Sequence, residues 1–226
     1  MISEKTVELN VTAELLNFLF TVTKRTHTAI APSQRAEGKL GYDVAYRGSA
    51  RVALIQYKRA YPNGSVWSWR LNRTRLKDQH QRLQRLESLG LLVFYAFPYF
   101  CMPAEVASKR MQLLKWTFWY RPSAIKPPGG PTGYHNVFFD SNCARWWVSS
   151  PEEFNLPAPL SISAVVNSLG AESAVVQYER LDAMLNKALL DPDEPPEDEA
   201  ISTEEWGSSL SAQSLILCDE SVDSDA

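Results

Sequence analysis

One stretch of the sequence, GYDVAYRGSARVALIQYKRAY (41–61), contains three residues whose types and spacing could do chemistry. Asp43 is followed thirteen residues later by Gln56, and Lys58 stands two positions further on, inside an apolar run. Side chains alternate across a strand, so Gln56 and Lys58 project from the same face. A buried amide and a buried ammonium without partners would be costly in free energy. The stretch therefore predicts a site that supplies those partners.

A bound cation and an acidic neighbour would complete this site. Asp43 is placed on the adjacent predicted strand. The Asp43 carboxylate and the Gln56 amide offer the oxygen ligands that a hard divalent cation, Mg²⁺ or Mn²⁺, prefers, and Glu14 on the first predicted helix would add another. A lysine beside such an ion can hold an attacking water and offset charge on a phosphoryl oxygen. The predicted chemistry is metal-dependent phosphodiester hydrolysis.

The elements that must position these residues follow from the apolar pattern. The pattern predicts the order helix-strand-strand-strand-helix-strand, over 4–25, 42–47, 51–60, 66–72, 75–90 and 91–100. The strand over 66–72 is expected to form a hairpin with the strand before it. The strand over 91–100 is apolar on both faces, which is typical of the middle of a mixed or parallel sheet. We therefore expect an α/β (α+β) fold with a mixed central sheet.

Charge is distributed unevenly along the 226 residues, whose net charge is −3. Residues 1–190 hold all 23 Lys and Arg against 14 Asp and Glu, a balance of +9, whereas residues 191–226 hold 12 acids and no base. A basic body predicts a polyanion partner, with a merely solubilising surface as the alternative. The arginines that we expect to contact nucleic acid are Arg47, Arg59, Arg73 and Arg75.

Composition argues against several other classes of protein. The N-terminal MISEKTVELN has no apolar segment of a secretory signal, and the longest apolar run, over 91–97, is far shorter than the roughly 20 residues of a membrane span. The three cysteines lie far apart without a C-x-x-C pair, so disulfides and zinc ribbons are not expected and a reducing cytoplasm fits best. The sequence has neither the G-x-S-x-G motif nor the Cys–His arrangement of serine and cysteine hydrolases, so these enzyme classes are not expected.

Asp43, the spacing to Gln56 and the segment IQYKR (55–59) resemble the PD-(D/E)XK nuclease superfamily, in the variant with glutamine in place of the second acid. The QYKR segment is similar to the Gln-x-Lys-Arg of Mrr-type restriction endonucleases. The helix-first element order is also similar to the core of that superfamily and of archaeal Holliday-junction resolvases. The similarity covers roughly residues 3–100, and Tyr42 stands where the family name has proline.

The resemblance implies a restriction-endonuclease-like core and a Mg²⁺- or Mn²⁺-dependent endonuclease acting on DNA, with defence against foreign DNA as its role. It implies that Asp43 and Gln56 bind the metal, that Lys58 positions the water, and that Glu14 or the competing Glu8 supplies the helix acid. It also implies a polar residue of the second helix facing the site, Gln79 or His80. The alternative is a non-catalytic nucleic-acid-binding or interaction subunit with the same fold.

Three regions are expected along the chain. A restriction-endonuclease-like domain with a hairpin extension occupies 1–155, and a helical segment occupies 156–190. Residues 191–226 form an acidic, Ser-rich tail for which the composition predicts disorder. We expect this tail to compete with nucleic acid for the basic body or to engage a protein partner, and a solvated appendage is the alternative. No membrane partner is expected, and a homodimer stays an open alternative.

Overall fold

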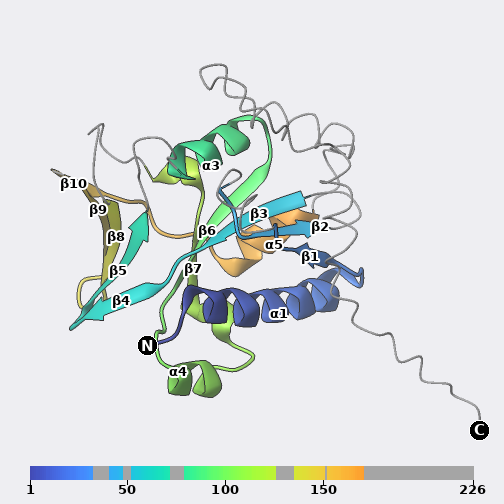
Figure 1. The fold of residues 1–226 in the computed structure, drawn as a ribbon, viewed down its shortest axis with the longest axis horizontal. Coiled ribbons are helices and arrows are strands. Elements are labelled where there is room, and N and C mark those ends of the chain that lie inside the picture. The colour runs from blue at the N-terminus through green and yellow to red at the C-terminus, as the bar shows by residue number, and fades with distance from the viewer. Residues whose placement is uncertain (33–40, 48–51, 72–78, 126–134, 151, 171–226) are drawn as a thin grey trace, which may run out of the picture.

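The structure, a computed structural model, describes residues 1–32, 41–47, 52–71, 79–125, 135–150 and 152–170 (Figure 1). Its strands form two sheets, and helices pack on the first of them. In chain order the elements are α1 (Glu4–Thr23), β1 (Thr28–Ile30), β2 (Val44–Arg47), β3 (Val52–Tyr57), β4 (Ala60–Asn63), β5 (Val66–Leu71), α3 (Gln79–Ser88), β6 (Leu92–Pro98), α4 (Pro103–Ser108), the 3₁₀ helix η1 (Leu113–Trp116), β7 (Thr117–Tyr120), the 3₁₀ helix η2 (Pro122–Ala124), β8 (His135–Asp140), β9 (Arg145–Ser150), β10 (Glu152–Asn155) and α5 (Ile162–Gly170).

The central sheet has the strand order β1-β2-β3-β6-β7. Strands β3 and β6 are parallel and the other neighbours are antiparallel, so the mixed sheet predicted from the sequence is present. A parallel pair needs a crossover connection, and α3 lies within it. Helices α1 and α3 cover opposite faces of this sheet (Figure 1).

Strand β3 is apolar because both of its faces are buried. Leu54 packs into the core on the α3 side, whereas Ile55 and Tyr57 pack into the core on the α1 side. Helix α1 begins after Ser3, whose hydroxyl caps the Thr6 amide. Its sheet-facing side repeats every three or four residues, as expected for a helix lying on a sheet: Val7, Glu8, Val11, Leu15 and Leu19.

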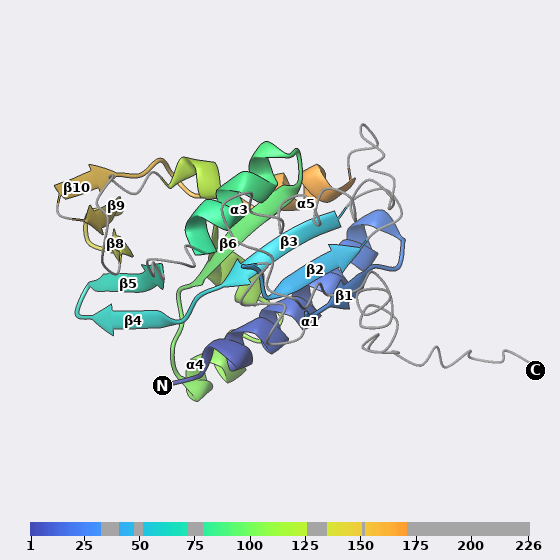
Figure 2. The ribbon, with the colours of Figure 1, turned by 45° about the horizontal axis from the view of Figure 1, so that its top comes forward.

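The second sheet has the order β10-β9-β8-β5-β4. Strand β4 follows β3 after only Lys58 and Arg59, so the chain continues almost directly from the central sheet into the second (Figure 2). One face of the second sheet, carrying Trp69, Val137 and Val148, is fully buried in the α3-side core. The expected hairpin of two strands near 134–150 is present as β8 and β9.

This arrangement corrects the prediction for the strand over 66–72. This strand, β5, forms a hairpin with β4 and not with β3, which covers most of the strand predicted over 51–60, and this hairpin belongs to the second sheet. In the central sheet, the three neighbouring antiparallel strands are β1, β2 and β3. Strand β1 has three residues, and the sequence pattern did not indicate it. The helix-strand-strand-strand-helix-strand order therefore occurs in the central sheet as α1-β1-β2-β3-α3-β6.

The C-terminal part of the described chain is α5. Val165 and Val166 of α5 are buried in the α1-side core, so the described part of the expected segment 156–190 packs on the central sheet. Residues 171–226, which include the acidic tail, lie outside the described residues. Within the described ranges, none of the helices combines the length and apolarity that a bilayer crossing requires.

Candidate functional site

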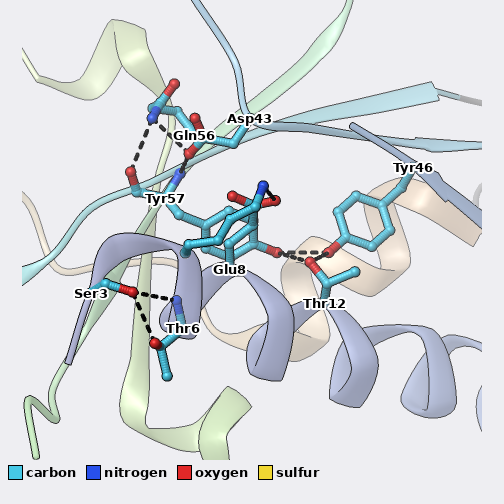
Figure 3. Close-up of polar contacts among 9 residues, drawn as sticks. Ser3, Thr6, Glu8, Thr12, Asp43, Tyr46, Gln56 and Tyr57 are labelled. Atoms are coloured by element: carbon cyan, nitrogen blue, oxygen red, sulfur yellow. Dashed lines mark hydrogen bonds and ion pairs between the residues drawn. The ribbon is translucent and has the colours of Figure 1, made fainter. Parts of the chain in front are cut away.

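Asp43 and Gln56 meet at one end of the β2–β3 pair. Val44 is the register partner of Ile55, so Asp43 and Gln56 are the next pair of neighbours on the α3 side. Oδ2 of Asp43 accepts hydrogen bonds of 2.7 Å from Gln56 Nε2 and 2.7 Å from the Tyr57 amide (Figure 3). Both side chains are buried, with 6% and 2% of their surface exposed. The sequence-predicted contact is present.

Two amide side chains connect Asp43 to Lys58. Gln56 Oε1 accepts a 2.6 Å bond from Gln79 Nε2, and Gln79 Oε1 accepts a 2.8 Å bond from Lys58 Nζ. Each amide therefore donates at its nitrogen and accepts at its oxygen. The lysine can only donate, so this direction of the chain is fixed from the Lys58 end. The convergence of Asp43, Gln56 and Lys58 that we predicted is thus observed, with Gln79 as the connecting residue.

Lys58 is 4% exposed and therefore largely removed from water. Besides Gln79, its Nζ lies 3.8 Å from Oε1 of Glu4, at the N-terminus of α1. Glu4 was not a predicted site residue. Because half of its side chain reaches solvent, with 45% exposed, Glu4 offers a charge at the mouth of the site without filling it.

Gly41 lets the start of α3 approach the site closely. Its φ is +83°, which favours glycine, and a Cβ there would lie 3.4 Å from Gln79 Cγ. A larger residue would therefore be strained by this backbone conformation, and its Cβ would contact the Gln79 side chain.

The first-helix acid expected from the sequence needs correction. Glu14 does not reach Asp43, because its carboxylate accepts bonds of 3.0 Å and 3.2 Å from the amides of Leu113 and Leu114 and so caps η1. Glu8, the alternative, is buried on the sheet-facing side of α1, where it pairs with Lys5 at 2.5 Å (Figure 3). Of the acids of α1, Glu4 is the one whose carboxylate lies within 4 Å of Lys58.

The hydroxyl groups of Thr12, Tyr46 and Tyr57 meet on the α1 side of β3. Tyr46 donates to Thr12 at 2.7 Å, and the Tyr57 hydroxyl lies 2.6 Å from Tyr46 and 3.1 Å from Thr12 (Figure 3). Burial raises the pKa of Tyr46 and the pKa of Tyr57 well above their ordinary value. Both phenols are therefore neutral at physiological pH and tie α1 to β2 and β3.

The remaining predicted contacts fall into three groups. His80 is corrected: it is 3% exposed and lies 3.1 Å from the Tyr95 hydroxyl and 2.9 Å from the Ile125 carbonyl, so it belongs to the core and not to a nucleic-acid surface. Arg59 is half-buried beside Met1. Arg47 ends β2, although its side chain is not among the described ones, and Arg73 and Arg75 lie outside the described residues.

The oxygen atoms at this site fit a hard cation, with few formal charges to hold it. Asp43 provides a carboxylate, Gln56 an amide oxygen and Tyr57 a main-chain carbonyl, which are the donor types that Mg²⁺ and Mn²⁺ accept. At present Gln56 Nε2 lies 2.7 Å from Asp43 Oδ2 and 3.0 Å from the Tyr57 carbonyl oxygen. Among the described residues, no group of three or more His, Cys, Asp or Glu could hold a metal. A cation would need Gln56 to turn its oxygen inward.

Sequence reasoning missed Glu4 and the main chain of Tyr57. A signal for Glu4 did exist, because Glu4 and Glu8 are one helical turn apart and so share a face of the helix. Comparisons of the chain with protein-family models, with curated proteins and with solved structures find no match.

Proposed function

We propose that this protein is a metal-dependent nuclease that hydrolyses phosphodiester bonds, with DNA as its substrate. The observation that carries the proposal is the chain of hydrogen bonds that joins buried Asp43, Gln56 and Lys58 through the half-buried Gln79. A carboxylate, two amides and an ammonium are costly to remove from water, and a purely structural core would be at least as stable with apolar residues. The resemblance to PD-(D/E)XK nucleases supports the same reaction.

In this proposal each side chain has one task. Asp43 and the Gln56 amide oxygen would hold the cation, which would supply Lewis-acid chemistry for the phosphate and the water. Lys58 donates to the attacking water or to a phosphoryl oxygen, since an ammonium in a poorly hydrated site stabilises developing negative charge strongly. In the metal-free site Gln79 holds Lys58 in place. Glu4 accepts a proton or a hydrogen bond at the mouth of the site.

A specific observation favours a second candidate, a non-catalytic nucleic-acid-binding or interaction subunit. The Gln56 nitrogen donates to the Asp43 carboxylate at 2.7 Å and to the Tyr57 carbonyl oxygen at 3.0 Å. Asp43 is the one carboxylate directly bonded to this glutamine among the described residues. A site that is satisfied without metal in this way is also what a binding module with a relict active site would contain.

Cutting assays separate the two candidates. The full chain is incubated with duplex, single-stranded and branched DNA and with RNA, in Mg²⁺ or Mn²⁺ and with a chelator. We expect cutting that the chelator stops and that Asp43→Asn and Lys58→Met abolish. Glu87→Gln is the matched control, because Glu87 lies near the opposite end of α3 from Gln79, where it accepts from Ser123, and its loss should leave cutting unchanged. Equal inertness of wild type and Asp43→Asn on every substrate would refute the nuclease.

A further inference from the structure

We infer that the outward face of the second sheet is a stacking surface for single-stranded nucleic acid, with the space above Ser68 as its base-binding position. The inference names a substrate class for the proposed nuclease and takes its biological sense from that proposal. Binding itself, however, needs neither the metal nor Asp43, so the two can fail separately.

One row of residues crosses all five strands of this sheet. The register pairs Tyr61 with Ser68, Ser68 with Phe138, Phe138 with Trp147 and Trp147 with Asn155. Directly paired residues share a face. Their chain neighbours Trp69, Val137 and Val148 are fully buried, so the row points away from the core. Three aromatic residues in the row remain half-buried, which leaves part of each ring open to a ligand.

The rings of this row are ordered by one another and by arginines. Phe138 and Trp147 stack with centroids 5.2 Å apart and planes 9° from parallel, and the Arg145 guanidinium lies 5.0 Å from the Trp147 ring centre. Trp147 already has Phe138 and Arg145 as neighbours. Among the described rings, none stacks on Tyr61 or on the side of Phe138 that faces it.

Ser68 separates Phe138 from Tyr61. Its hydroxyl donates to the Tyr61 carbonyl oxygen at 3.2 Å, so this short side chain turns back to the main chain. Two strand spacings put the backbones of Tyr61 and Phe138 about 9.6 Å apart. A base stacked between two rings needs about 6.8 Å, twice the stacking distance of bases in a duplex. The row therefore has a short side chain, and no ring, between Tyr61 and Phe138, and we take this gap as the base-binding position.

Charge at this end of the face selects a polyanion. The guanidinium groups of Arg59 and Arg70 lie 5.3 Å and 4.6 Å from the Tyr61 ring centre, and neither forms an ion pair with any described residue. Nε of Arg59 is buried without a hydrogen-bond acceptor. Arg145, at the other end, is neutralised by Glu153 at 3.0 Å. The uncompensated positive charge thus lies beside the base position, where a phosphate backbone would pass.

The outward face of the second sheet is also close enough to the candidate site along the chain for one nucleic-acid strand to reach both. Tyr61 is three residues from Lys58 along an extended segment, a distance of about 10 Å. The bases of a duplex are paired and stacked inside it, whereas the unstacked bases of a single strand can lie on aromatic side chains. We therefore assign the face to single strands and not to duplex DNA.

Fluorescence anisotropy on the full chain in EDTA tests the inference, with a labelled mixed-sequence single strand and the corresponding hairpin duplex. Tyr61→Leu and Phe138→Leu should each weaken single-strand binding about fivefold or more, the effect of losing one stacked base. Ser68→Phe should weaken it comparably by filling the position, whereas Ser68→Ala should not. Arg70→Gln should lower the slope of log affinity against log salt by about 0.7.

Trp116→Leu is the matched aromatic control, since Trp116 is also exposed beside a cation, Lys109, but lies outside the second sheet. Circular dichroism and thermal melting confirm that each variant is folded. Unchanged binding by both Tyr61→Leu and Ser68→Phe would overturn the inference, as would equal loss in Trp116→Leu or preference for the duplex. Cutting without these effects would refute the stacking surface alone, and these effects in an inert protein would refute the nuclease alone.

Discussion

Gln56 donates to Asp43 at 2.7 Å while it accepts from Gln79 at 2.6 Å, so its amide has one orientation. If Gln56 turns its oxygen toward Asp43, its nitrogen meets the nitrogen of Gln79. Gln79 must then turn as well, and its nitrogen would face Lys58, which cannot accept. If Asp43 and Gln56 hold a cation as proposed, Gln79 would have to release Lys58, and the ammonium would then be free to donate to water or phosphate.

This coupling predicts the behaviour of Gln56→Glu. A second carboxylate beside Asp43 should repel it in the absence of metal and lower the melting temperature, because like charges in a buried site are unfavourable. Mg²⁺ or Mn²⁺ should restore the melting temperature more in this variant than in the wild type, since the added charge binds the cation more tightly. Differential scanning fluorimetry across a metal titration measures the effect.

Gln56→Leu serves as the control, because it removes the amide without adding a charge. Its melting temperature should not respond to metal. A metal response that is equal in wild type, Gln56→Glu and Gln56→Leu would place the cation elsewhere.

Substitutions of Asp43 should separate its charge from its hydrogen bonds. Asp43→Asn retains an oxygen for the Gln56 and Tyr57 donors, so we expect its stability to stay within about 1 kcal/mol of wild type. Asp43→Ala leaves both donors buried and unsatisfied, at about 1–3 kcal/mol each. Urea unfolding of the two variants measures the difference. Equal stability of Asp43→Asn and Asp43→Ala would contradict these two hydrogen bonds.

The core of this site could be predicted because it depends on local geometry. The alternation of a strand places Gln56 and Lys58 on one face, and the antiparallel pairing of β2 with β3 places Asp43 opposite Gln56. The acid of α1 could not be predicted in this way. Whether Glu4, Glu8 or Glu14 reaches Lys58 depends on where the helix crosses the sheet, and tertiary packing decides that crossing.

Tertiary packing also explains why the role of His80 and the presence of β1 were not predicted. Gln79 and His80 are consecutive on a helix and point about 100° apart, so a small rotation of α3 decides which one faces β3. Strand β1 has only three residues, too few to show alternation, and β5 has the pattern of a central-sheet strand although it lies in the second sheet. The predicted pattern of elements recurs in the central sheet only because β1, which was not predicted, takes the place of β5, which was assigned to the wrong sheet.

Glu14 and Glu4 should give opposite phenotypes. Glu14→Ala removes the acceptor for two amides of η1 and should lower the free energy of unfolding by about 1–2 kcal/mol, in the range of a lost helix cap. It should leave metal response and cutting unchanged. Glu4→Gln should leave stability almost unchanged, since exposed pairs contribute little, and should lower cutting. Urea unfolding and the cutting assay, run on both variants, check this assignment. Loss of cutting at full stability in Glu14→Ala would reverse it.

The buried phenols predict a loss of stability at alkaline pH. The folded-state pKa of Tyr46 is raised by burial, so below about pH 10 the folded and unfolded chains both keep this proton. Above that pH the unfolded chain loses a proton that the folded chain retains. The free energy of unfolding should then fall by up to about 1.4 kcal/mol per pH unit for this residue.

Urea midpoints at pH 8 and pH 10.5 test this dependence. Tyr46→Phe should show a smaller drop between the two values than wild type. Thr12→Val removes a hydrogen-bond partner but no titrating group, so its drop should match the wild type even if its stability at pH 8 is lower. An identical drop in wild type and Tyr46→Phe would show that another group titrates.

The acidic tail is expected to act on the nucleic-acid surface through charge. Twelve acids and no base in residues 191–226 are attracted to a body of charge +9 and compete with phosphates for it. Screening over about 8 Å at physiological salt limits the effect to low ionic strength. A chain ending at residue 190 should therefore bind single strands several-fold more tightly at low salt, with the gain shrinking as salt rises. A full-length chain with residues 191–226 shuffled keeps the charge and should bind like wild type. If the shuffled chain instead behaves like the truncated one, the tail acts through a specific contact and not through charge.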